Sequence, residues 1–177
     1  MKKFLIGVLF YFVFLIFYLL QTNFFSWFTI AGISPNIFII LILFLGLYTD
    51  NKFATILSII IGVTLDLVVG KTLGVTAITF CLITFICRYF DKNFSKDNQL
   101  SNLILIIGLT IVCESISYFL NCLILETSIE IVSFIRILTI EVFYNAILTF
   151  IFYNTILRLG GTIERQFKER NILTRYF

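Results

Sequence analysis

The chain has 177 residues, of which 60% are hydrophobic and only 13% are charged, and its mean hydropathy is +1.06. A water-soluble domain of this size cannot bury that much apolar surface, so we expect an all-α integral membrane protein. The formal net charge of +3 is too small to indicate a nucleic acid as the partner.

The sequence contains no histidine, and it therefore lacks the commonest general base and the commonest metal ligand. The four cysteines fall inside apolar runs and form no CxxC pair, so they indicate packing thiols rather than a zinc site or a disulfide framework. These residues are Cys81, Cys87, Cys113 and Cys122. The composition thus indicates no metal and no cofactor.

Apolar runs predict a six-helix transmembrane domain over residues 1–161. The first run follows Lys2-Lys3, but it is too long for a signal peptide and no small-residue cleavage site follows it, so we expect a retained helix. An aromatic cluster around Trp27 then indicates a membrane interface. The predicted helices cover about residues 4–20, 35–48, 53–69, 74–89, 102–125 and 134–157.

Two dipeptides predict helix ends. Ser34-Pro35 is typical of a helix start, because Ser is a good N-cap and Pro at the first helical position loses no needed hydrogen bond. Gly160-Gly161 is predicted to end the last helix.

The segment 162–177 is predicted to be a basic cytoplasmic tail. Leu159, Ile163 and Phe167 recur every four residues at its start, which is typical of an amphipathic helix lying on a membrane surface. A solvated terminus is the alternative interpretation.

The distribution of Lys and Arg predicts the orientation, because cytoplasmic segments carry the excess of basic residues. With a cytoplasmic N-terminus, eleven of the 13 basic residues fall inside. These are Lys2, Lys3, Lys52, Arg88, Lys92, Lys96, Arg158, Arg165, Lys168, Arg170 and Arg175. Only Lys71 and Arg136 fall outside, so both termini are predicted to be cytoplasmic.

Three ionisable side chains lie within predicted spans, namely Asp66, Glu114 and Glu141. Such residues are rare in membranes and usually face the bundle interior, which makes them candidates for a functional site. Each glutamate shares a helical face with other polar residues. The two faces are Glu114, Ser117, Tyr118, Asn121 and Glu141, Tyr144, Asn145, Thr149.

The predicted depths place these groups toward the outer side of the membrane. We expect a polar cluster of Asp66, Asn121, Glu141 and Asn145, with Glu114 nearer the middle and Lys71 and Arg136 as counter-charges. Three interpretations remain open: hydrogen bonds that hold helices together, a docking site for a partner, or a pocket for a small molecule or an ion.

Several of these residues together resemble the bacterial rod shape-determining protein family MreD. Gln21 ends the first predicted helix, and Gly62-x-x-x-Asp66-x-x-x-Gly70-x-x-Leu73-Gly74 joins the third to the fourth. Ser34-Pro35-Asn36 opens the second helix. The family usually has Asp after this Pro, so Asn36 is a departure that puts a charge-dependent role there in doubt.

The resemblance implies a non-enzymatic scaffold of the cell-elongation complex in the bacterial cytoplasmic membrane. Members associate with MreC, a single-span protein, and through it with RodA, a penicillin-binding transpeptidase and MreB filaments. The resemblance also implies the six-helix fold of substrate-binding subunits of energy-coupling-factor vitamin transporters. On this view the outer polar cluster is a candidate surface for MreC, and the basic cytoplasmic face, especially the tail, contacts anionic lipids or filament-side partners.

Two alternatives remain. A vitamin-transporter binding subunit has the same size and orientation, but such subunits usually present alanine faces on helix one, and residues 4–20 contain no Ala and seven aromatic residues. An ion or proton carrier would use Asp66, Glu114 and Glu141.

Overall fold

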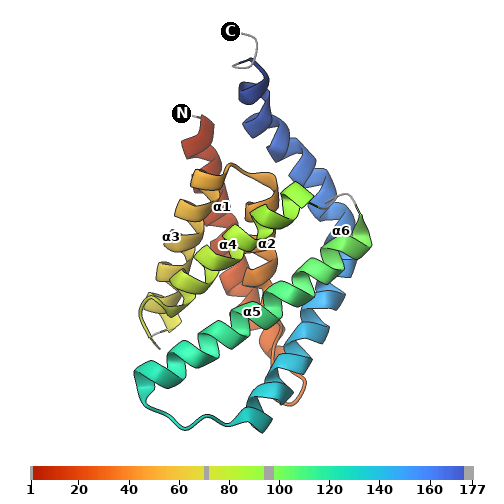
Figure 1. Ribbon diagram of the computed structural model, residues 1–177. Helices are drawn as coiled ribbons and strands as arrows, with labels where there is room; N and C mark the ends of the chain where they lie inside the picture. Colours follow the sequence, from red (N-terminus) through yellow and green to blue (C-terminus); the bar gives the residue numbers. More distant parts are fainter. Residues whose placement is uncertain (1, 70–71, 94–97, 174–177) are drawn as a thin grey trace.

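The computed structural model describes residues 2–69, 72–93 and 98–173, and within these ranges it is all-helical apart from one isolated bridge between Ile30 and Ile33 (Figure 1). The all-α part of the predicted class is therefore confirmed. Six α-helices follow in the order α1 Lys2–Leu19, α2 Ile37–Tyr48, α3 Asn51–Val69, α4 Val75–Asn93, α5 Gln99–Leu125 and α6 Ile131–Leu173.

Within the described residues, four helical segments are long and apolar enough to cross a membrane. They are Lys3–Trp27, Asn51–Val69, Gln99–Leu125 and Ile131–Phe167. The first is longer than α1 because the chain continues through a π-helical turn, Leu20–Phe24, and a 3-10 turn, Phe25–Trp27. Trp27 at its end is 88% exposed. These lengths and compositions are consistent with a membrane protein.

α2 forms the interior of the bundle. All 12 of its residues are buried, and it packs against α1, α3, α4, α5 and α6. At about 1.5 Å per residue it is about 18 Å long, which is short of a hydrocarbon core of about 30 Å. Its uniformly apolar sequence therefore reflects its burial among the other helices.

The start of α2 differs from the prediction. The helix begins at Ile37 with Asn36 as its N-cap residue, and Asn36 makes no side-chain capping bond. The predicted N-cap role of Ser34 is wrong, because the Ser34 hydroxyl instead accepts a hydrogen bond from Gln21 Nε2, 3.3 Å away. Side chains from other elements accept the hydrogen bonds of the first backbone N–H groups of α2.

The predicted end of the last helix at Gly160-Gly161 is also wrong, because α6 continues to Leu173. Its 43 residues make a helix about 65 Å long. Gly160 is instead a point of close approach, since a Cβ atom there would lie 2.5 Å from Tyr48 Cε1 on α2. Glycine here admits the Tyr48 ring and leaves the helix unbroken.

The beginning of the predicted tail is thus part of α6. Ile163 and Phe167 of its apolar stripe face the protein, whereas Leu159 is exposed. Phe167 is 5% exposed and packs on Phe53 with ring centroids 5.2 Å apart. Lys3 Nζ lies 5.3 Å from the centroid of the same Phe167 ring. The last residues of the predicted tail, 174–177, lie outside the described residues.

α3 and α4 approach closely at Gly62. A Cβ atom at this position would collide with the backbone Cα and N of Ala77 on α4, and backbone atoms cannot move aside as the end of a side chain can. Gly62 therefore sets the distance between these two helices.

We predict that Gly62→Ala lowers the stability of the fold by about 1–3 kcal/mol, because the added methyl group forces α3 and α4 apart. Gly108→Ala is the matched control, since a Cβ atom on Gly108 meets nothing within 4 Å. Thermal unfolding of the detergent-solubilised variants measures the difference. Equal melting temperatures for the two variants would contradict this account of Gly62.

Candidate functional site

Asp66 joins the end of α3 to the start of α4. Its side chain is 6% exposed; Oδ2 accepts the Gly74 N–H at 2.8 Å and Oδ1 accepts the Thr76 N–H at 3.3 Å. The first N–H groups of a helix lack intrahelical partners, and a negative charge at the N-terminus also interacts favourably with the helix dipole. Gly74 lies just before α4 with a φ of +93°, a backbone conformation that favours glycine.

The counter-charges predicted for the cluster are not seen in the described residues. Gly70 and Lys71 lie outside them, so the prediction for Lys71 stays a prediction. Arg136 is exposed and forms no ion pair with a described residue. Asp66 is instead neutralised in part by the backbone N–H groups of α4.

A polar cavity of about 250 Å³ opens beside Asp66, between the start of α2 and helices α3, α4 and α5. Asn121 Oδ1 accepts a hydrogen bond from the Thr72 hydroxyl at 2.5 Å on its wall. The tertiary structure thus brings Asp66 together with most of the predicted polar face of α5. The polar lining residues are Asn36, Asp66, Thr72, Thr76, Thr79, Glu114, Ser117 and Asn121.

Tyr118 belongs to the same predicted face but does not line this cavity. Its hydroxyl oxygen accepts the N–H of Glu130, 2.8 Å away, just before α6 begins. Its ring stacks on Phe134 with centroids 4.6 Å apart. Tyr118 therefore holds the start of α6 rather than the cavity.

Asn145 on α6 reaches the start of α2. It is 0% exposed; its Oδ1 accepts the Asn36 N–H at 3.0 Å, and its Nδ2 donates to the Thr110 hydroxyl at 3.1 Å. Asn36 Nδ2 in turn donates to Glu114 Oε1 at 3.2 Å. Through its backbone N–H and its side-chain amide, Asn36 thus connects the start of α2 to both α6 and α5.

Thr110 is a member of this network that the sequence analysis missed. It lies four residues before Glu114 and hence on the same face of α5. Extending the polar stripe by one turn toward the N-terminus would have found it.

Gln21 holds the other side of the same helix start. Its Nε2 donates to the Pro35 carbonyl at 2.5 Å, and its Oε1 accepts the Ile37 N–H at 3.5 Å. A further bond runs from the Tyr144 hydroxyl to the Phe28 carbonyl at 2.6 Å. The segment between α1 and α2 is therefore tied to α6 as well.

Glu141 is buried near the network. It is 9% exposed, its charged neighbour is Glu114, and its Oε2 atom has no hydrogen-bond partner among the described residues. The polar faces predicted on α5 and α6 thus meet at the two glutamates. Glu141 does not line the cavity beside Asp66.

The cavity presents hydrogen-bond acceptors. Because Asn36 Nδ2 is committed to Glu114, Asn36 Oδ1 is left buried with no donor among the described residues. Asp66 and Glu114 add carboxylate oxygens. Such a lining suits a ligand or partner group that donates hydrogen bonds. Among the described residues there is no group of three or more His, Cys, Asp or Glu side chains that could hold a metal ion.

Long apolar helices around a buried polar network define a helical membrane protein whose polar residues are concentrated where α2 and α4 begin. A family model described as rod shape-determining protein MreD matches residues 1–160, and the chain belongs to this family. The resemblance to this family drawn from Gln21, Pro35 and Asp66 is confirmed. Comparison with curated proteins and with solved structures gave no match.

Family membership implies a role in determining rod shape, and MreD is not known as an enzymatic family.

We predict that Asp66→Ala exposes the start of α4, because two backbone N–H groups lose their acceptor. Leaving such groups unpaired costs about 1–3 kcal/mol each. Asp66→Asn keeps one acceptor oxygen and should lose less. Hydrogen–deuterium exchange over residues 72–78 measures the effect, and faster exchange in the order wild type, Asn, Ala is expected. Exchange that is the same in all three proteins would show that Asp66 does not cap α4.

Proposed function

We propose that this protein is a non-enzymatic membrane scaffold of the cell-elongation complex, which regulates cell shape and lateral peptidoglycan synthesis by binding an MreC-like single-span protein. The family match over residues 1–160 supports the role in rod shape. The resemblance implies the further partners, which are RodA, a penicillin-binding transpeptidase and MreB filaments, reached through the MreC-like protein.

The proposal includes a topology of six membrane passes with both termini cytoplasmic, in the bacterial cytoplasmic membrane, and a fold like that of energy-coupling-factor binding subunits. Two observations support the orientation. α1 begins and α6 ends at the same end of the molecule (Figure 1), and Lys3, Arg158 and Arg165 belong to that end. Basic residues are retained on the cytoplasmic side.

The observation that carries the partner proposal is the acceptor-rich cavity beside Asp66. In the proposed orientation it lies at the outer end of the bundle, where the α3–α4 turn and the α5–α6 loop also lie (Figure 1). Asn36 Oδ1 has no hydrogen-bond donor among the described residues, and Asn36 lines this cavity. A basic or amide side chain from the extracytoplasmic part of a single-span partner would supply a donor.

A vitamin-transporter binding subunit is the second candidate, because a cavity of about 250 Å³ at the outer end would admit a small ligand. The family match favours the scaffold. α1 also lacks alanine and exposes large aromatic rings such as Phe4, at 78%, where those subunits typically present small residues to their coupling partner.

We predict that the protein purified from its native membranes brings down an MreC-like single-span protein, and that Ser117→Phe weakens this association. The phenyl ring would fill the cavity that Ser117 lines. Loss of a central contact of about 2 kcal/mol corresponds to roughly a thirtyfold lower affinity. Quantitative co-purification measures it.

Gly108→Phe is the matched control, since it places the same ring on α5 in open space. Recovery of only an ATPase module and its coupling subunit would overturn the scaffold proposal in favour of the transporter. Equal recovery of the MreC-like protein with both variants would keep the scaffold but remove the cavity from the interface.

A further inference from the structure

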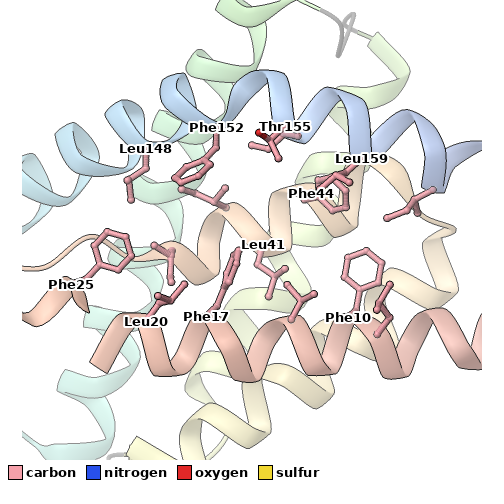
Figure 2. A pocket seen from close by; sticks show the side chains of 16 residues that line it. Phe10, Phe17, Leu20, Phe25, Leu41, Phe44, Leu148, Phe152, Thr155 and Leu159 are labelled. Carbon is pink, nitrogen blue, oxygen red and sulfur yellow. The ribbon is translucent and has the colours of Figure 1, made fainter. Parts of the chain in front are cut away.

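A second cavity lies apart from the polar one. It is an apolar groove of about 490 Å³ between α1 and α6, with α2 as its floor. Side chains of α1 and α6, such as Phe17 and Phe152, point into it from opposite sides, and Leu41 on α2 lies between them (Figure 2). None of the residues of the polar network lines this groove.

The groove lies within segments that are able to cross a membrane, Lys3–Trp27 and Ile131–Phe167. Its surroundings are therefore lipid hydrocarbon, and lateral entry of lipid between α1 and α6 needs no passage through water. An empty apolar groove of this size would forfeit the dispersion contacts of all its lining atoms. Something of matching polarity must fill it.

The lining does not suit a transmembrane helix. Helix–helix interfaces in membranes are enriched in small residues and use polar side chains as hydrogen-bonding groups. The groove contains no Gly, Ala or Ser, and Thr155 is its one residue with a polar side chain. A flexible hydrocarbon chain needs neither close backbone approach nor a hydrogen bond, and it can follow a wall made of Phe, Leu and Ile side chains.

Two basic side chains, Lys3 and Arg158, lie near lining residues of the groove. Lys3 lies over Phe167, one helical turn beyond the lining residue Ile163. Its ammonium group pairs with Asp50 at 2.6 Å but remains 45% exposed. Arg158 is exposed next to the lining residue Leu159. Basic pockets between transmembrane helices on the cytoplasmic side bind the head groups of anionic lipids.

We propose that the groove between α1 and α6 holds an acyl chain of an anionic phospholipid, with the head-group phosphate beside Lys3 and Arg158. The apolar wall recognises the chain and the two basic side chains recognise the charge. The assignment to the cytoplasmic leaflet rests on the orientation proposed above. The groove and its two basic side chains do not depend on that orientation or on the MreC-like partner.

The chain-binding half is tested by native mass spectrometry of the protein purified in mild detergent. We expect the wild type to retain a phospholipid, and Thr155→Trp to lose it because the indole fills the groove. Ile151→Trp is the control, since Ile151 is 62% exposed on α6 and does not line the groove. Absence of bound phospholipid, or equal retention by both variants, would overturn the proposal.

A benzophenone amino acid at position 155, activated in native membranes, identifies the occupant directly. An adduct with the mass of a phospholipid supports the proposal. An adduct with another membrane protein would overturn it in favour of a helix in the groove.

The charge-recognising half is tested by titrating the delipidated protein with phosphatidylglycerol and phosphatidylcholine. We expect a preference for phosphatidylglycerol that falls about fivefold with Lys3→Ala and again with Arg158→Ala. Loss of the exposed Lys3–Asp50 pair should cost the fold little. Arg136→Ala, at the opposite end of α6, should leave the preference unchanged. Equal affinity of the wild type for both lipids would overturn the head-group assignment.

The lipid assays and the co-purification have separate readouts, so they separate the two proposals. Lipid retention together with no MreC-like protein in the co-purification would keep the groove and overturn the scaffold, and the reverse result would do the opposite.

Discussion

A backbone N–H group inside a membrane must find its acceptor within the protein, and the starts of helices are where this demand is hardest to meet. In this structure side chains from other elements meet it at the starts of α2, α4 and α6. Asp66 receives two N–H groups of the α4 start, Gln21 and Asn145 receive those of the α2 start, and Tyr118 receives the one before α6. These polar side chains of an otherwise apolar chain therefore serve as hydrogen-bond acceptors for the first backbone N–H groups of its helices.

The chemistry of the cavity beside Asp66 follows from the same constraint. Asn36 donates its backbone N–H to Asn145 and its side-chain NH2 to Glu114, which leaves its side-chain carbonyl oxygen without a donor among the described residues. Asp66 lines the cavity while it holds α4. Hydrogen-bond acceptors thus lie together in this cavity, and a donor group from a ligand or partner would pair with the Asn36 oxygen. The docking and structural interpretations of these residues are compatible, because the same atoms serve both.

Glycine shows where local sequence reasoning stops. Gly160 was expected to end a helix, and α6 instead passes through it because its missing side chain makes room for the ring of Tyr48. Gly62 likewise makes room for the backbone at Ala77. A glycine in a sequence indicates either a break or a close approach. The choice depends on what lies opposite, here a residue 112 positions away for Gly160 and 15 for Gly62.

The sequence by itself determined that this is a helical membrane protein of the MreD family with the ionisable residues Asp66, Glu114 and Glu141 inside its helices. It could do so because hydropathy, helical periodicity and the order of motifs are local properties of the chain. The tertiary structure decided the rest. The bond between Asn36 and Asn145 joins residues 109 positions apart, and the burial of all of α2 depends on five other helices. No local pattern specifies those partners, because each contact exists only once the surrounding helices have packed.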